Sequence, residues 1–234
     1  FSYTDITTIP DGLFNNCINA TDFSETFNEC TLLTSIDSGI FPPSAENFSL
    51  TFANTDSLTT VASDIFDATS SAAIFYRLFY KSKIVNIPDG LFANTAGTDF
   101  SNAFEQSYIT HAGDLFGART EELNLTDLFR SSRLATVSDT IFSGLVNQKS
   151  LRYTFYNVNY LLTIPVDLFA NNVNLIDVTS IFRASGAITT IPENLFANNI
   201  LLEIADEAFQ QCNSLTEIPG NLFANNINLK SIDY

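Results

Sequence analysis

Phenylalanine recurs along this chain at a nearly constant interval, and this repetition limits the possible fold more than any other feature of the sequence. A step of Leu or Ile followed by Phe recurs in register nine times as a first column, and successive Phe residues of this column are 24 to 27 positions apart. The first column holds Phe14, Phe41, Phe66, Phe92, Phe116, Phe142, Phe169, Phe196 and Phe223. A fixed period of this length is typical of solenoids, in which each repeat forms one coil.

A second Phe column lies about half a period later, and a third stands four residues before the second. The second column holds Phe1, Phe27, Phe52, Phe79, Phe104, Phe129, Phe155, Phe182 and Phe209. The third holds Phe23, Phe48, Phe75, Phe100, Leu125, Leu151, Val178 and Ala205. One repeat cannot bury its own apolar face, but stacked repeats can. We therefore predict continuous aromatic spines, in which each buried Phe contributes about 1.5–3 kcal/mol.

Each repeat also carries signals for a short strand and a corner. Apolar pairs three residues apart, such as Ile84 and Ile87, often precede a Pro, which cannot extend a strand ladder. Pro followed by an acid and Leu-Phe, as at 9–14 and 87–92, is typical of a helix start. The sequence predicts an α/β repeat solenoid of about nine coils of 24–27 residues, with short parallel strands and short helical turns.

The repeats run through residues 1–234 without a linker, so we predict a single domain. Phe1 stands at a second-column position, and the sequence stops at Tyr234 just before the next one. We expect the domain to be truncated within a repeat at both ends. Either it continues in a longer array, or flanking repeats or other copies stack on its ends.

Charge and composition argue against several functional classes. The chain has 26 acidic and 10 basic residues, a net charge of −16. Such a surface repels nucleic acid and anionic membranes, and no apolar stretch approaches the ~18 residues of a membrane span. With His111 as the single histidine and no phosphate loop, catalytic carboxylate pair or zinc spacing, we predict no enzyme, no nucleic-acid partner and no membrane insertion.

Two runs, 20–37 and 208–219, resemble the bacterial surface protein 26-residue repeat, a relative of the BspA-type leucine-rich repeats. The second run holds the family core in Phe209, Cys212, Leu215 and Ile218. The resemblance covers essentially the whole chain and implies a leucine-rich-repeat-like solenoid in a larger secreted or cell-envelope protein. It also implies an adhesin or ligand-binding role without catalysis, and it carries over no fixed binding residues.

Small polar residues follow the column Phe residues by three positions. Cys17, Cys30 and Cys212 share this position with Asn, Ser and Thr. They lie on different half-coils, too far apart for a disulfide, so we predict partly buried hydrogen-bonding residues and not reactive thiols. The Asn pairs at 171–172, 198–199 and 225–226 predict a ladder of amides to the neighbouring coil, with sugar recognition as the alternative.

An acidic column marks the corners of the repeats. It holds Asp11, Asp64, Asp89, Asp114, Asp139, Asp167 and Glu193. Stacked carboxylates repel one another and present only oxygen ligands, which suits calcium. Because no Asp-x-Asp or Gly-rich calcium loop accompanies them, we predict no cofactor, with calcium at this column as the alternative.

Basic and tyrosine residues gather around the second Phe column. Eight of the ten basic residues fall between positions 77 and 152, and Tyr and Arg are the residue types that most often anchor interfaces. The predicted binding residues are Tyr76, Arg77, Tyr80, Lys81, Arg130, Arg133, Arg152, Tyr153, Tyr156 and Arg183. The alternative is ordinary surface covered by long side chains.

These features predict a non-catalytic repeat domain outside the cell that adheres to or recognises a host or neighbouring-cell protein or glycan. The bacterial envelope is the expected location. One alternative is a structural or virion component, such as a phage fibre or tail module, assembled by end-to-end or side contacts. Another is the targeting module of a hydrolase whose catalytic domain lies elsewhere.

Overall fold

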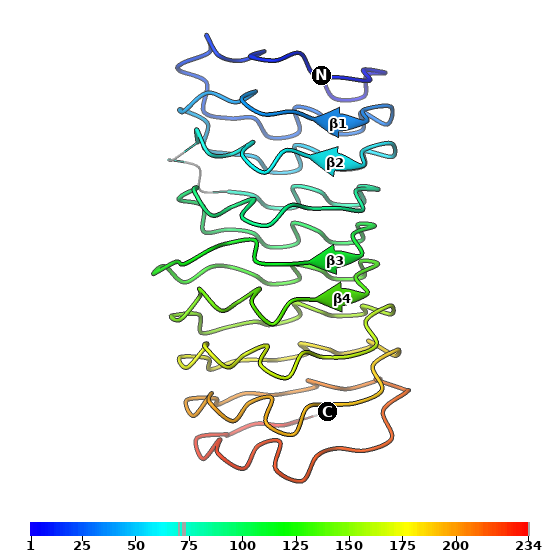
Figure 1. Cartoon of the computed structure of the whole chain (residues 1–234), viewed down its shortest axis with the longest axis vertical. Coiled ribbons are helices and arrows are strands. Elements are labelled where there is room, and N and C mark those ends of the chain that lie inside the picture. The colour runs from blue at the N-terminus through cyan, green and yellow to red at the C-terminus, as the bar shows by residue number, and fades with distance from the viewer. Residues whose placement is uncertain (70, 72–73, 234) are drawn as a thin grey trace.

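The chain winds into stacked coils that form a rod, as the computed structural model shows (Figure 1). The structure describes residues 1–69, 71 and 74–233. The N-terminal coil lies at one end of the rod and the C-terminal coil at the other. Each coil passes through two parallel ladders and makes two turns, one at each long side of the rod.

The first ladder contains the regular strands, and all of them are short. They are β1 (Ser35–Ile36), β2 (Thr60–Val61), β3 (His111–Ala112) and β4 (Thr136–Val137). β1 pairs with β2 and β3 with β4, both parallel, and an isolated parallel bridge joins Thr163 to Thr190. The prediction of short parallel strands is confirmed.

The second ladder consists of isolated parallel bridges between neighbouring coils. It runs through Asp22, Asn47, Ile74, Asp99 and Asn124, and then through Ser150, Asp177, Ile204 and Ser231. No bridge joins Asn124 to Ser150 among the described residues. There the buried side chain of Gln148 makes hydrogen bonds to the backbone in place of a bridge between the two stretches of the ladder. Its Nε2 donates to the carbonyls of Leu123 and Ser150, and its Oε1 accepts from the Leu123 N–H.

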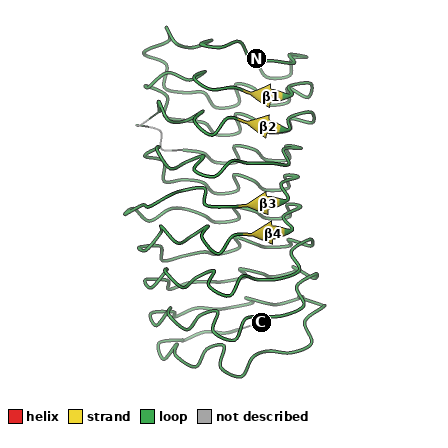
Figure 2. Ribbon diagram, viewed as in Figure 1, coloured by secondary structure: helices red, strands yellow, loops and turns green. Residues whose placement is uncertain are grey.

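The predicted helical turns are wrong: the described residues contain no helix (Figure 2). At the corner predicted as a helix start, the Leu13 N–H donates to the Pro10 carbonyl at 3.3 Å, and the Asn15 N–H to the Gly12 carbonyl at 3.0 Å. These bonds span three residues, whereas an α-helix needs bonds that span four. Gly12 also has a φ of +67°, which reverses the chain direction before a helix can propagate.

The prediction of continuous aromatic spines is confirmed for the second column and only in part for the first. Second-column rings stack from Phe1 to Phe209 with centroids 5.3 to 5.7 Å apart. First-column rings stack at 5.5 to 6.2 Å. Among the described residues no such stacking joins Phe116 to Phe142, so the first spine is interrupted there while the second is continuous.

The backbone around the second column has an unusual and regular conformation. From Phe27 to Phe209, the residues two before and two after each second-column Phe have φ between 53° and 62°. Left-handed residues thus alternate with residues of negative φ, and every second backbone N–H points toward the next coil. Glu25, Phe27 and Glu29, for example, donate to the carbonyls of Ser49, Thr51 and Ala53 at 2.9 to 3.0 Å. Backbone bonds therefore join the coils along this side, which we call the second-Phe side.

Side chains join the coils along the opposite, first-Phe side. Buried Asn199 donates through Nδ2 to the carbonyls of Phe169 and Asn172 at 3.0 and 2.8 Å, and Asn172 and Asn226 repeat this pattern. The outer amide of Asn198 bonds the Ala170 carbonyl at 3.0 Å. These bonds confirm the predicted asparagine ladder.

The cysteines occupy the predicted positions and none of them is bonded to another. Cys30 and Cys212 are buried, and the Cys212 thiol donates to the Phe182 carbonyl at 3.1 Å. Burial raises the pKa of the Cys212 thiol to about 11, which suppresses thiolate chemistry. Cys17 is exposed, so the expectation of a partly buried residue is wrong there.

Candidate functional site

All ten predicted binding residues lie on the second-Phe side, where the alternating backbone decides which side chains face outward. Around Phe79 the pattern is typical: Leu78 and Phe79 are buried, Tyr76 and Tyr80 are half-buried, and Lys81 is exposed. The fold therefore places the tyrosines and cations of successive coils in parallel rows along the rod. Whether these rows bind a partner remains the prediction made from the sequence.

Acidic residues, most of them in neighbouring coils, pair with most of the predicted arginines. Arg77 lies 3.3 Å from Glu105, and Arg152 lies 3.4 Å from Asp177. Arg130 pairs with Asp127 of its own coil at 3.3 Å, and Arg183 pairs with Glu207. Sequence reasoning missed these acids because it considered the cations alone. Reading each row from one repeat to the next would have found them, about one period away.

Tyrosine rings hold several guanidinium groups in place. The Arg133 Cζ lies 3.6 Å from the centre of the Tyr108 ring, and the Arg130 Cζ lies 4.6 Å from that of Tyr156. Arg183 approaches the same Tyr156 ring at 5.9 Å. Cation–π contacts of this kind orient the guanidinium and leave its N–H edge for carboxylates or other acceptors.

Burial shapes the electrostatics of this band. It raises the pKa of the Asp127 carboxyl, and the neighbouring Arg130 guanidinium opposes that shift. The Glu105 side chain is only 8% exposed beside Arg77. The paired arginines therefore stabilise carboxylates that the fold has partly removed from water.

Two outward rows of the second-Phe side border a groove of about 360 Å³. One row stands two residues after each second-column Phe, and the other four residues after it. The lining residues are Glu29, Asn54, Asp56, Lys81, Lys83, Gln106 and Tyr108. Of these, only Lys81 is among the predicted binding residues. The groove was missed because it follows from the backbone alternation, which the sequence pattern did not reveal.

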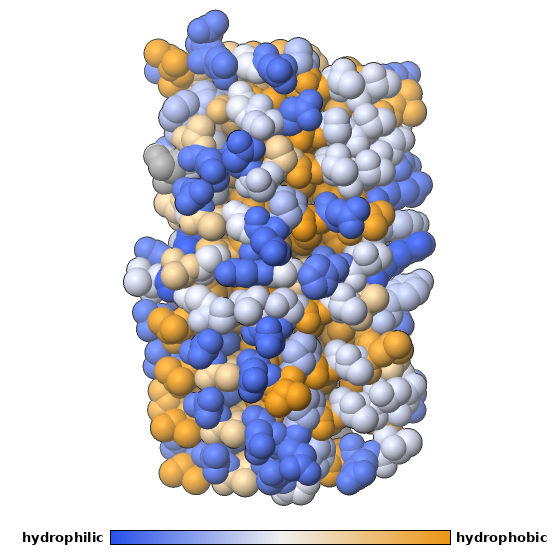
Figure 3. Space-filling view, viewed as in Figure 1, coloured by the Kyte–Doolittle hydropathy of each residue, from blue (hydrophilic) through white to orange (hydrophobic). Residues whose placement is uncertain are grey.

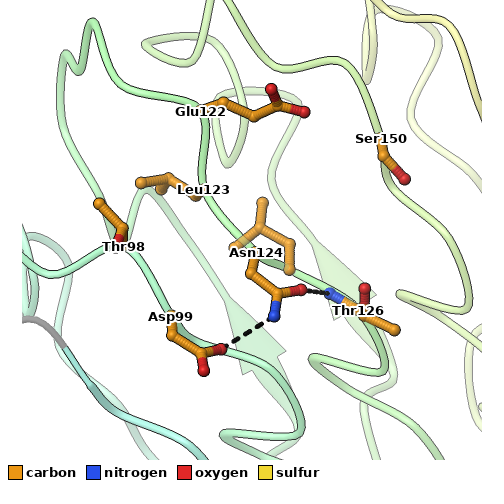
Figure 4. Close-up of a pocket in the computed structure, with 8 residues that line it drawn as sticks. Thr98, Asp99, Glu122, Leu123, Asn124, Thr126 and Ser150 are labelled. Atoms are coloured by element: carbon orange, nitrogen blue, oxygen red, sulfur yellow. Dashed lines mark hydrogen bonds between the residues drawn. The ribbon is translucent and has the colours of Figure 1, made fainter.

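A second hollow of about 430 Å³ lies where Gln148 interrupts the second ladder (Figure 4). It is lined by Thr98, Asp99, Glu122, Leu123, Asn124, Leu125, Thr126 and Ser150. Asn124 Nδ2 donates to Asp99 Oδ1 at 3.0 Å, and Glu122 pairs with Lys149 at 3.2 Å. Asp99 is bonded to Asn124 and Glu122 is paired with Lys149, so the hollow offers no obvious acid–base pair.

The surface outside these sites is mixed. Exposed aliphatic side chains stand four residues after first-column Phe residues, at Val146, Val173, Ile200 and Ile227. Figure 3 shows hydrophobic groups recurring along one edge of the rod. In the described part of the chain, no three His, Cys, Asp or Glu residues gather as a metal would require. Nor does that part contain a helix long and apolar enough to cross a membrane.

Several solved structures are similar to this chain. A leucine-rich cell surface protein from Faecalibacterium prausnitzii is 21% identical over 100% of this chain and 70% of its own, with a TM-score of 0.43. The Drosophila Toll–Spatzle complex is 19% identical over 98% of this chain and 30% of its own, with a TM-score of 0.38. A leucine-rich repeat protein from Bacteroides ovatus is 12% identical over 97% and 78%, with a TM-score of 0.19.

No protein-family model matches the chain, and no curated protein matches it either.

Proposed function

We infer that this chain is a non-catalytic recognition module that works outside the cell and binds a protein or glycan partner through its second-Phe side. One observation carries this proposal: backbone hydrogen bonds hold that side together, so the fold does not dictate its outward side chains. The row directly after each second-column Phe reads Asn28, Ala53, Tyr80, Glu105, Arg130, Tyr156, Arg183 and Gln210. Asn28, Ala53 and Glu105 are buried, and the other five are half-buried.

Four positions of this row hold Tyr or Arg, the residue types that dominate interfaces. They are Tyr80, Arg130, Tyr156 and Arg183. Tyr153 and Tyr156 are half-buried and their rings lie 6.1 Å apart, so they present a rigid aromatic surface. Arg152 beside them keeps 46% of its side chain exposed. The resemblance of the repeats to bacterial surface protein repeats supports a location at the bacterial envelope.

A binding screen with charge-reversal variants tests this proposal. The 234-residue chain is applied to a glycan array and to a panel of purified extracellular glycoproteins. Arg152→Glu combined with Tyr153→Ala should abolish binding to whatever the native chain binds. Lys149→Glu is the control that changes the net charge by the same amount, since Lys149 is exposed and directly precedes the second ladder.

Circular dichroism and thermal unfolding confirm that each variant folds. Binding that persists in the Arg152 and Tyr153 variant, or that is lost equally in the lysine control, would refute recognition through the second-Phe side.

A further inference from the structure

The groove between the two outward rows is built by the backbone. The residue between the rows, three after each second-column Phe, faces inward and is buried at Thr55, Ser82 and Ser107. The N–H of Lys81 donates to the Glu105 carbonyl at 2.9 Å, and that of Lys83 to the Thr55 carbonyl at 3.0 Å. Both rows are therefore fixed before a ligand arrives, which lowers the entropy that binding would cost.

The lining of the groove suits a ligand rich in hydroxyl groups. Asn54 and Gln106 offer amides that both donate and accept, and Glu29 and Asp56 offer acceptors. Its seven lining residues include no aliphatic side chain. A peptide bound at this point would find neither an open sheet edge nor an apolar pocket for its side chains.

Two lysines, Lys81 and Lys83, line the groove beside two carboxylates, Glu29 and Asp56, in a chain of net charge −16. Lys81 is exposed, with its Nζ 5.0 Å from the Tyr80 ring centre. Lys83 pairs with Asp56 at 3.2 Å, but both side chains are about half exposed, so the pair is weak and exchangeable. Arg133 stands in the same row as Tyr108, one coil further on, and covers the Tyr108 ring face. A neutral sugar therefore cannot stack on that face of the Tyr108 ring, whereas an anionic group can bond the Arg133 guanidinium.

We propose that this groove binds an anionic polysaccharide, whose sugars carry carboxylate or sulfate groups, in an orientation along the rod. Lys81 and Arg133 contact the charged groups, and Asn54 and Gln106 bond the ring hydroxyls. The coils repeat at 5.5 to 5.7 Å here, measured between Phe27, Phe52, Phe79, Phe104 and Phe129 ring centres. That spacing is close to the length of one sugar in an extended chain, so successive sugars meet successive coils. The inference rests on the proposed recognition function and names the partner class.

Isothermal titration of the 234-residue chain tests the inference with four probes: a galacturonate oligomer, a chondroitin sulfate oligomer, a neutral galactan oligomer and poly-glutamate. One of the two anionic glycans should bind, and binding should weaken as salt rises. Lys81→Ala combined with Arg133→Ala should weaken it at least about tenfold, as expected for lost charge-assisted hydrogen bonds. Lys149→Ala combined with Lys230→Ala, which removes the same charge away from the groove, should leave the affinity unchanged.

The two anionic glycans separate carboxylate from sulfate recognition, and either result supports the proposal. Equal binding of neutral galactan would overturn the anionic preference, and tighter binding of poly-glutamate would point to an acidic polypeptide. Failure of all the probes would overturn the inference. The proposed function would still stand if the array screen found a partner that depends on Arg152 and Tyr153.

Discussion

The two long sides of the rod follow the same period but join neighbouring coils by different means. On the second-Phe side, alternate backbone N–H groups bond the next coil and the aromatic spine is continuous. On the first-Phe side, most turns close within each coil, and side chains such as Asn172, Asn199 and buried Arg119 reach the preceding coil. Backbone bonds such as that from the Gly90 N–H to the Asp114 carbonyl, at 2.7 Å, also cross between coils there. The spine on this side is interrupted between Phe116 and Phe142.

This difference explains where sequence variation can serve function. Where side chains join the coils, residue identity is fixed by the bonds they make, as in the repeated asparagines. Where the backbone joins them, the bonds between coils do not depend on which outward residue is present, and pairs such as Arg77 with Glu105 add to those bonds. The tyrosines, arginines and lysines proposed to bind a partner all occupy the second kind of position.

The largest effect is expected from truncating the continuous spine. Phe104 is fully buried, with its ring centre 5.5 Å from Phe79 and 5.6 Å from Phe129. Phe104→Ala should lower the free energy of unfolding by about 3–5 kcal/mol, because it leaves a cavity among rings that cannot collapse. Urea denaturation followed by circular dichroism measures this loss.

The matched variant is Phe116→Ala, at the interruption of the first spine. Phe116 is equally buried but contacts only Phe92 and Phe100 among the aromatic rings of the described residues. Its loss should cost less than that of Phe104 by about 0.5–1.5 kcal/mol, the contribution of one aromatic pair. An equal or larger cost at Phe116 would show that the interruption does not weaken the first-Phe side.

A methyl group added beside this interruption should be the next most damaging change. A Cβ at Gly144 would lie 2.1 Å from the Gly117 carbonyl oxygen, and backbone cannot rotate away as a side chain can. Gly144→Ala should therefore destabilise the fold by about 1–3 kcal/mol through overpacking. Gly220→Ala is the control, because a Cβ at that position would meet no atom within 4 Å, and it should be neutral in the same melts. Equal melting temperatures for the two variants would mean that the coils here are not tightly packed.

The architecture could be predicted from the sequence because the buried residues repeat. Each Phe of the three columns must leave water, and a constant period permits this only in stacked coils. The helical turns could not be predicted correctly, because Pro-Asp-Gly-Leu-Phe satisfies the local signals of a helix start. At the first corner the left-handed φ of Gly12 interrupts a helical conformation. At 165–170, where no residue has a positive φ, the backbone bonds still span only three residues, so the turn of the coil itself prevents the helix.

The candidate site was predictable in part. The position of Arg130 or Tyr156 next to a second-column Phe indicated the correct side of the rod. The pairing of the arginines with acids was not predictable from local spacing. Glu105, for example, pairs with Arg77 from the next coil. The groove depends on left-handed φ values at residues such as Asn54 and Lys81, which no glycine signals in the sequence.

Removing a buried asparagine amide on the first-Phe side should lower the free energy of unfolding by a moderate amount. The loss tests whether side chains join the coils on that side. Asn199→Ala leaves the Phe169 and Asn172 carbonyls without the donors that bond them, and should cost about 1–3 kcal/mol. Asn198→Ala, which removes one exposed bond to Ala170, should cost less than about 1 kcal/mol. Thermal unfolding of the two variants compares them. Similar losses of stability in the two variants would contradict the view that buried asparagines such as Asn199 join the coils while exposed ones such as Asn198 add little stability.

The smallest expected effect tests the backbone conformation of the second-Phe side directly. Here a change from Ala to Gly should stabilise the protein, whereas such a change usually destabilises it. Ala184 has a φ of 60°, a conformation that costs an L-residue about 1–2 kcal/mol and costs glycine almost nothing. Because glycine also loses more chain entropy on folding, Ala184→Gly should stabilise the protein by a net of about 0.5–1 kcal/mol. Ala170→Gly, on the first-Phe side and without a positive φ, should destabilise it by a similar amount. Opposite shifts of the urea midpoint in these two variants would establish that the backbone of the second-Phe side is strained. The hydrogen bonds between coils would then offset that strain. Destabilisation by both would mean that the left-handed residues carry no strain there.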